Sequence, residues 1–316
     1  EHKIGLEIHV YIDTKEKLFC SCLVDPTAKP NTTICPRCTG QPGAKPMLPS
    51  KEAIEKVMKT GLMLNCRLNN NLVWQRKHYD WPDMPQGYQK TMSGSYAVPV
   101  GEDGKFLDVA IRELHLEEDP ARWDPETGTV DYNRSGYPLI EIVTEPEFAD
   151  AESVRDWLKS LLTTLQYVKA VNKGLGLKCD VNVSIAPLFS RVEIKNVNSF
   201  KSIVKAIHYE LDRQKKELVP GKRMEQHTRA WVEHEGTTVF MRSKEHALDY
   251  RFIPDPDLPV VEITTKELQR IQKELPAGPQ QRMQKLIARG VTPENAKIIA
   301  SDLYVADFFD SIKSVD

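Results

Sequence analysis

Apolar and polar residues alternate almost strictly at the beginning of the chain. The apolar positions of residues 4–12 share one face of an extended segment: Ile4, Leu6, Ile8, Val10 and Ile12. This period of two residues predicts a β-strand. The other face carries Glu7 and His9, so we expect the strand to hold a carboxylate and an imidazole side by side.

Helical spacing follows at residues 51–64, where apolar side chains recur every three or four positions and Ser50 can cap the first turn. Further helices are expected at 151–165 and 202–217, and strands at 106–116, 130–132, 139–144, 181–185 and 192–194. Residues 71–100 are rich in aromatic side chains and proline, which indicates short strands and an extended loop. Because no regular strand–helix–strand repeat is present, the pattern predicts an α+β fold with a mainly antiparallel sheet and flanking helices.

The pattern changes near residue 264. Residues 266–274 and 280–289 are charged and helical, and Thr292 followed by Pro293 opens another helix. We therefore expect a sheet domain over residues 1–264 and the beginning of a helical domain over residues 265–316. The helical domain is expected to continue beyond Asp316.

The composition is that of a globular protein, with 40% hydrophobic and 28% charged residues. No apolar run approaches the ~18 residues that span a bilayer, and residues 1–5 lack the apolar stretch of a signal peptide. A cytoplasmic location without a membrane partner is expected. The net charge of −2 neither suggests nor excludes nucleic acid, so contacts with RNA would have to come from local patches or a partner subunit.

Cysteine spacing predicts a metal site within residues 19–46. A Cys-x-Cys pair and a Cys-x-x-Cys pair flank a 12-residue loop: Cys20, Cys22, Cys35 and Cys38. Four thiolates complete the tetrahedral coordination of Zn²⁺ and leave no open position, so such a knuckle is structural. The alternative is four reduced cysteines without a ligand. Cys66 and Cys179 are isolated.

Acidic residues recur on several predicted strands. Besides Glu7, they are the run Glu117–Asp119, Glu141 inside an apolar strand, and Asp180 on an alternating segment. A carboxylate among apolar residues is costly to bury unless it is paired or binds a cation. Taken singly, each acid is better explained as a paired or exposed residue. Together they suggest a cup of oxygen ligands for Mg²⁺.

Basic residues complement these acids in the second half of the chain: Arg191, Lys195, Arg242, Lys244 and Arg251. Acids that hold a metal and bases that hold phosphate are the groups used in phosphoryl transfer. The chain has neither a P-loop motif nor a kinase glycine loop, so ATP would have to bind in another manner.

A dozen short motifs, in order over residues 4–263, resemble the B-subunit family of the glutamyl/aspartyl-tRNA amidotransferases. The first five are Gly5–Val10, Leu18–Cys22, Cys35–Cys38, Pro82–Gln89 and His115–Asp119. The others are Asp131–Gly136, Leu139–Pro146, Asp180–Ser184, Glu193–Ser199, Met241–Glu245, Asp249–Arg251 and Pro254–Pro259. Each motif alone is weak evidence, but their common order is specific.

The resemblance implies a cradle-shaped catalytic domain and a two-step reaction. ATP phosphorylates the side-chain carboxylate of Glu-tRNA(Gln) or Asp-tRNA(Asn). Ammonia, released from glutamine by a glutaminase (A) subunit, then passes through a tunnel and displaces the phosphate. The implied partners are this A subunit, a small C subunit and the misacylated tRNA.

Matching positions imply roles for individual residues. The candidates for catalysis and Mg²⁺ binding are Glu7, His9, Glu118, Glu141 and Asp180. Lys77 and Tyr79 match positions near the mouth of the tunnel. Arg191, Lys195 and Arg251 are candidates for binding phosphate or the tRNA 3′ end.

The chain departs from the family pattern at Gln86, where the family often has Lys, and at Pro120–Arg122, where Ala-Gly-Lys is usual. Three other interpretations stay open. The related archaeal subunit for Glu-tRNA(Gln) carries a large synthetase-like insertion, for which 316 residues leave little room. A non-catalytic zinc-bearing RNA-binding module could stack bases on the aromatic residues of 74–96. A metal-dependent hydrolase built on His9 and the acids is a third reading, but no His-x-x-x-His pair or comparable histidine cluster supports it.

Overall fold

A nine-stranded sheet forms the centre of the computed structural model, which describes residues 1–172, 175–187, 189–218, 225–243 and 250–312. The strands lie in the order β14 (Thr237–Ser243), β13 (His227–Val232), β12 (Val192–Val197), β11 (Leu177–Ile185), β1 (His2–Tyr11), β10 (Pro138–Thr144), β7 (Val109–Glu118), β6 (Gly101–Phe106) and β2 (Arg67–Leu68). Only β12 and β13 pair in parallel; all other neighbours in this sheet are antiparallel. The predicted α+β fold with a mainly antiparallel sheet is confirmed.

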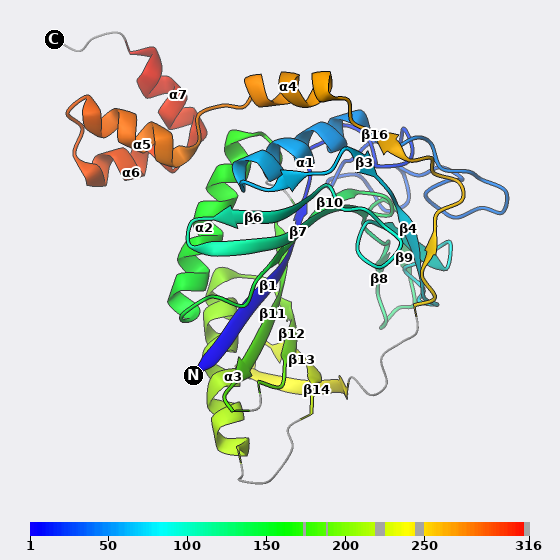
Figure 1. The fold of residues 1–316 in the computed structure, drawn as a ribbon. Coiled ribbons are helices and arrows are strands. Elements are labelled where there is room, and N and C mark those ends of the chain that lie inside the picture. The colour runs from blue at the N-terminus through cyan, green and yellow to red at the C-terminus, as the bar shows by residue number, and fades with distance from the viewer. Residues whose placement is uncertain (173–174, 188, 219–224, 244–249, 313–316) are drawn as a thin grey trace.

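Strand β1 has the two faces that the alternation predicts. Ile4, Leu6 and Ile8 are buried, and burial of each such side chain stabilises the fold by about 1.5–3 kcal/mol. They face the helices α1 (Lys51–Met63), α2 (Ala151–Tyr167) and α3 (Phe200–Glu217), which Figure 1 shows along one side of the sheet. The opposite side of the sheet therefore carries Glu7 and His9.

Residues 71–100 form short strands, two of which pair with short strands from residues 253–262, and residues 122–131 form a further short pair. They form a sheet of β15 (Ile253–Pro254), β4 (Gln75–His78) and β5 (Tyr88–Thr91), and the pairs β16 (Val261–Glu262) with β3 (Asn71–Leu72) and β8 (Arg122–Trp123) with β9 (Val130–Asp131). Figure 1 shows β4, β8 and β9 on the side of the large sheet away from α2 and α3. These elements therefore lie on the same side of the sheet as the polar face of β1.

One predicted strand, residues 106–116, is wrong as a single element. Strand β6 ends at Phe106, which pairs with Val109 at the beginning of β7. The turn between them places Leu107 at a φ of 54°, a left-handed conformation that disfavours residues with a side chain. Leu107 is not a residue that favours this conformation, and Asp108 alone is a weak turn signal, so the local sequence indicates this hairpin only weakly.

Four helices close the described chain: α4 (Thr265–Lys273), α5 (Pro279–Ala288), α6 (Pro293–Ala300) and α7 (Leu303–Ser311). Thr292 caps α6 as expected, because its side chain accepts a hydrogen bond from the backbone N–H of Asn295. Helix α7 was not predicted as a separate element. In the described part of the chain no helix has the length and apolar character needed to cross a bilayer. The domain division at residue 264 stays a prediction.

Candidate functional site

Strand pairing brings the predicted acids together on the polar face of the sheet. In an antiparallel pair, residues directly opposite one another point to the same side. Glu141 of β10 lies opposite His9, and Asp180 of β11 lies opposite Glu7. The same rule adds Glu117, from the acidic run, and Glu193, because they lie opposite Leu139 and Asn182. Neither acid is among the residues to which the resemblance assigns a role.

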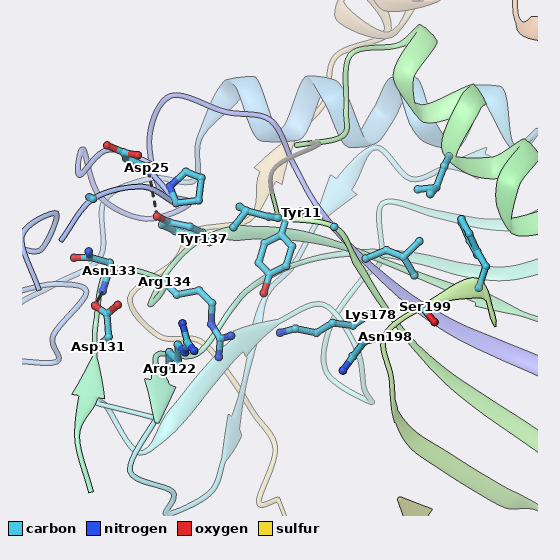
Figure 2. A pocket seen from close by; sticks show the side chains of 17 residues that line it. Tyr11, Asp25, Arg122, Asp131, Asn133, Arg134, Tyr137, Lys178, Asn198 and Ser199 are labelled. Carbon is cyan, nitrogen blue, oxygen red and sulfur yellow. Dashed lines mark hydrogen bonds between the residues drawn. The ribbon is translucent and has the colours of Figure 1, made fainter. Parts of the chain in front are cut away.

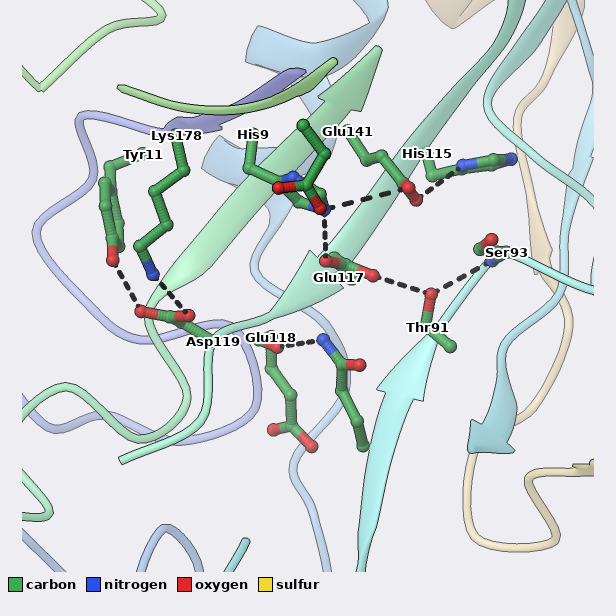
Figure 3. Close-up of polar contacts among 12 residues, drawn as sticks. His9, Tyr11, Thr91, Ser93, His115, Glu117, Glu118, Asp119, Glu141 and Lys178 are labelled. Carbon is green, nitrogen blue, oxygen red and sulfur yellow. Dashed lines mark hydrogen bonds and ion pairs between the residues drawn. The ribbon is translucent and has the colours of Figure 1, made fainter. Parts of the chain in front are cut away.

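His9, Glu117 and Glu141 form the first of two groups with the geometry of a cation site. Their ligand atoms lie within 4.8 Å of one another. The Nε2 atom of His9 is 3.4 Å from Glu117 Oε1 and 3.7 Å from Glu141 Oε1, as Figure 3 shows. Thr91 donates a hydrogen bond of 2.8 Å to Glu117 and fixes its second oxygen. Two carboxylates and one imidazole therefore point at one position.

His115 contacts the second carboxylate oxygen of Glu141. Its side chain is 2% exposed, with Nδ1 at 2.9 Å from Glu141 Oε2 and Nε2 at 3.0 Å from Glu113 Oε2. Burial opposes its charged form, but the hydrogen bonds and charges of Glu113 and Glu141 outweigh burial and raise the pKa of His115 to about 9. Burial of Glu141 alone would raise its pKa. The hydrogen bond with His115 and the charges of His9 and His115 outweigh burial and lower the pKa of Glu141 to about 2.

Glu7, Asp180 and Glu193 form the second group, again with ligand oxygens within 4.8 Å of one another. Lys195 lies against it, with Nζ at 2.5 Å from Asp180 and 3.1 Å from Glu193. Burial and the neighbouring charges of Glu193 and Glu141 raise the pKa of Glu7, even though Asn182 donates it a hydrogen bond of 3.1 Å. The three carboxylates of this group face one ammonium, that of Lys195, so a divalent cation would neutralise the remaining negative charge.

Both groups line one cavity of about 550 Å³. Cationic and aromatic side chains complete its wall: Lys77, Lys178, Lys195, Arg242, Tyr79 and Tyr250. Lys77 and Tyr79, the predicted tunnel residues, thus stand beside the acids, and Lys77 Nζ lies 4.6 Å from the ring centroid of Tyr250. Oxygen ligands next to several cations suit a polyphosphate carried with a divalent ion.

Glu118 is the predicted ligand that the structure separates from the others. It follows Glu117 on β7, so its side chain leaves the opposite face of the strand. There it forms a buried ion pair with Lys90, at 3.0 Å. Among the described residues, Glu118 belongs to neither of the two carboxylate groups and does not line the cavity. Figure 3 shows its carboxylate turned away from His9. The structure therefore groups Glu117, and not Glu118, with His9 and Glu141.

Two predicted phosphate residues also lie away from the cavity wall. Arg191 is exposed just before β12, and Arg251 is exposed, with its backbone carbonyl accepting a hydrogen bond of 2.8 Å from His78 if that ring carries its proton on Nδ1. Of the three residues predicted to bind phosphate or the tRNA 3′ end, Lys195 lines the cavity and the other two do not. Lys244, Glu245 and Asp249, which belong to the predicted motifs, lie outside the described residues.

The four predicted cysteines meet in one cluster, with sulfur atoms within 4.8 Å of one another. The backbone N–H of Cys35 lies 3.2 Å from Cys38 Sγ, and the buried Lys17 places its ammonium 3.4 Å from the same sulfur. The hydrogen bond with Cys20, against burial and together with the charge of Lys17, lowers the pKa of Cys38 to about 5. These contacts favour thiolate at Cys38, whereas the hydrogen bond with Cys38 raises the pKa of Cys20 and burial raises that of Cys22. Four sulfur atoms that can reach one position are the donor set of a tetrahedral zinc site, so the residues fit the predicted ion.

The raised pKa of His115 gives an expected pH dependence for the protein without metal. A histidine whose pKa rises on folding adds stability that is complete below its unfolded value of about 6.5 and is lost as the pH passes about 9. The stability difference between wild type and His115→Gln, measured by urea unfolding with EDTA, should therefore shrink between pH 6.5 and pH 9.

The exposed His234 provides the control, because its side chain is 82% exposed and lies outside both groups. The difference between wild type and His234→Gln should stay constant over the same pH range. A constant difference for His115→Gln as well would contradict the charged state assigned to His115.

Comparison with known proteins identifies the family. A family model described as the GatB/GatE catalytic domain matches residues 2–269. The B subunit of the aspartyl/glutamyl-tRNA(Asn/Gln) amidotransferase of Methanopyrus kandleri is 46% identical over 314 residues, which cover 98% of this chain and 67% of that protein. Proteins with the same name from Methanocaldococcus jannaschii and Methanothermobacter thermautotrophicus are 44% and 45% identical over 98% of this chain, and 66% and 68% of their own lengths are covered.

The chain thus spans about two thirds of the length of these relatives. The match extends through the sheet, both carboxylate groups and the cysteine cluster. It confirms the resemblance that the ordered motifs indicate. The chain therefore belongs to the family of the GatB/GatE catalytic domain.

Proposed function

We propose that the chain is the catalytic part of the B subunit of a tRNA-dependent amidotransferase. In this role it uses ATP to phosphorylate the side-chain carboxylate of Glu-tRNA(Gln) or Asp-tRNA(Asn), and the product is then amidated. The observation that carries the proposal is the single cavity in which two carboxylate groups face Lys77, Lys178 and Lys195, in a chain of this family.

The residues of the cavity fit the first step. His9, Glu117 and Glu141 would hold Mg²⁺, and Glu7, Asp180 and Glu193 offer a second set of oxygens. Bound Mg²⁺ neutralises phosphate charge as it develops. The substrate carboxylate attacks the γ-phosphorus, the bond to the bridging oxygen breaks, and ADP leaves. Because two anions have to approach one another, the lysines on the wall reduce their repulsion.

The second step needs ammonia at the same position. Ammonia attacks the acyl carbon, phosphate leaves with the C–O bonding electrons, and a proton is lost to form the amide. Lys77 and Tyr79 stand on the wall near the acids, where we place the mouth of the path for ammonia from a glutaminase A subunit. A small C subunit completes the proposed complex.

The function is tested with the full-length protein and its A and C partners. Glu-tRNA(Gln) and Asp-tRNA(Asn) are offered separately with glutamine, ATP and Mg²⁺. We expect ADP release that depends on Mg²⁺ and on one or both misacylated tRNAs, together with formation of the amidated aminoacyl-tRNA. A complex that binds tRNA and never consumes ATP would instead support the RNA-binding module.

A further inference from the structure

One aromatic side chain from residues 250–262 reaches the cavity that holds both carboxylate groups. This segment follows the last strand of the large sheet and runs beside β4, where β15 pairs with it and Ile253 lies opposite Arg76. Figure 1 shows the segment in orange on its way to α4. Just before β15, Tyr250 lines the cavity, whereas the neighbouring Arg251 is exposed. The segment therefore contributes its ring, and not its guanidinium, to the cavity wall.

His78, the last residue of β4, fixes the backbone at this point. Its backbone N–H donates a hydrogen bond of 2.9 Å to the carbonyl of Tyr250, and its ring Nδ1 lies 2.8 Å from the carbonyl oxygen of Arg251. Arg251 has a φ of 44°, in the left-handed region that residues with a side chain rarely adopt. Such a conformation persists only where the surrounding structure holds it. The position of Tyr250 is therefore set by β4 and not by the local preference of its own segment.

The ring of Tyr250 carries the ammonium of Lys77, the residue before His78 on β4. Lys77 Nζ lies 4.6 Å from the ring centroid, within the distance of about 6 Å at which a cation is attracted to an aromatic face. Among the described residues, this ammonium has neither a hydrogen bond nor an ion pair. A lysine side chain has much rotamer freedom to lose when it is ordered. The contact with the ring therefore decides where the charge of Lys77 lies.

The ring itself is held by two further aromatic side chains. Tyr79 meets it edge-on, with centroids 6.3 Å apart and an interplanar angle of 77°. Phe252 packs against it with a centroid distance of 5.9 Å. Edge-to-face aromatic pairs attract one another beyond the effect of burial. These contacts keep the ring of Tyr250 in one orientation, with Lys77 over its face.

The charge of its partner distinguishes Lys77 from the two other lysines of the cavity wall. Lys195 is held by Asp180, at 2.5 Å, and Lys178 is held by Asp119, at 3.4 Å. Each of these carboxylates compensates the charge that it positions. A ring is uncharged, so it orders the ammonium of Lys77 and leaves its positive charge available to an anion in the cavity.

We propose that Tyr250 is a positioning residue of the proposed reaction, because its ring holds the Lys77 ammonium at the cavity wall where two anions have to meet. The inference rests on the proposed function, in which the wall lysines reduce repulsion between the substrate carboxylate and the phosphate of ATP. A charge stabilises a transition state most effectively if it is already in place before the reaction begins. Tyr250 supplies this placement for Lys77.

Reductive methylation of the full-length protein with ¹³C-formaldehyde tests the contact without any turnover. It converts lysines to dimethyl-lysines, which keep their charge and whose methyl groups are observed by NMR. A ring shifts the resonance of methyl groups over its face upfield. The Lys77 signal, assigned by its absence from Lys77→Arg, should be shifted upfield in wild type and in Tyr250→Phe, and should lose this shift in Tyr250→Leu. A Lys77 signal without an upfield shift in wild type would overturn the inference.

Kinetics of the complex with its A and C partners test the consequence. Tyr250→Leu should lower kcat for ATP-dependent amidation about 2- to 30-fold, the range that corresponds to loss of one cation–π contact. Tyr250→Phe keeps the ring and should recover most of this loss. In a Lys77→Met background, Tyr250→Leu should cause no further loss, because the two side chains act as a unit. Tyr96→Leu is the matched control, since Tyr96 is 55% exposed and does not line the cavity.

The double variant separates positioning from a purely structural role. If the losses of Tyr250→Leu and Lys77→Met multiplied, Tyr250 would act independently of Lys77 and the inference would be wrong. Activity of Tyr250→Leu equal to that of Tyr96→Leu would contradict it as well. If the wild-type complex shows no ATP-dependent amidation, the proposed function fails, while the NMR result still decides whether Tyr250 holds Lys77.

Discussion

Glu117→Gln is expected to weaken binding of Mg²⁺ or Mn²⁺ at least about 10- to 100-fold, whereas Glu118→Gln leaves it unchanged. Even outer partners of metal ligands alter affinity by this factor, and Glu117 stands among the proposed ligands themselves. Glu118, the next residue on β7, points to the opposite face. The two variants make the same chemical change at adjacent positions, so each is the control for the other. Calorimetric titration with the cation measures both.

The free energy of unfolding should distinguish the same two variants in the opposite order, with the larger loss in Glu118→Gln. Glu118→Gln leaves the ammonium of Lys90, whose side chain is 2% exposed, without its carboxylate partner. Breaking a buried ion pair on one side typically costs about 3–5 kcal/mol, which urea unfolding in EDTA would detect. Glu117→Gln keeps a hydrogen-bond acceptor for Thr91 and reduces repulsion from Glu141, but it removes the carboxylate 3.4 Å from His9. Because these effects oppose one another, we expect a smaller loss of stability than in Glu118→Gln. If Glu118→Gln lowered cation affinity as strongly as Glu117→Gln, the proposal that Glu117 and not Glu118 is a ligand would be wrong.

The contrast between these neighbours shows what the sequence could predict about the site. Alternation on β1 places Glu7 and His9 on one face, and the structure agrees. The same alternation, applied to Leu114 and Leu116, puts Glu117 on the polar face and Glu118 on the other. The position of Glu118 could therefore have been recognised from its own segment.

Other parts of the site have no local signal. Glu7 and Asp180 meet because β1 and β11 pair in one register, and that register is set by contacts between segments far apart in sequence. Glu193 lies between the predicted cations Arg191 and Lys195 in the sequence, and the pairing of β12 with β11 is what brings it to the acids. Another cavity, of about 640 Å³, is likewise lined by Tyr11, Arg122 and Phe200, which no motif connects (Figure 2). Helix caps and strand alternation depend on neighbouring residues and can be read from the sequence. The convergence of side chains from different strands depends on tertiary contacts and cannot.

Cys38→Ser should remove zinc and destabilise the protein by at least about 3 kcal/mol, a small part of the roughly 10–16 kcal/mol that zinc binding contributes in zinc-finger peptides. Residues 19–46 contain few core side chains, so the cluster is their main internal constraint. It is tied to the remainder of the fold by hydrogen bonds from Ser135 to the Cys38 carbonyl and from Met47 to the Phe19 carbonyl. Loss of the ion therefore reaches both the loop before β10 and the approach to α1.

The buried Lys17 adds to the expected loss of stability, because its ammonium loses the thiolate of Cys38 as a charged partner. Its remaining partners, the carbonyl of Tyr132 at 3.3 Å and the ring of Tyr137, are uncharged. Zinc content by atomic absorption and free energy of unfolding by urea are the measurements, with Cys66→Ser as the control for losing a buried thiol outside the cluster. Wild type should contain one zinc per chain, Cys66→Ser should keep it, and Cys38→Ser should lose it. Unchanged zinc content and stability in Cys38→Ser would mean that the four cysteines are reduced thiols without a structural ion.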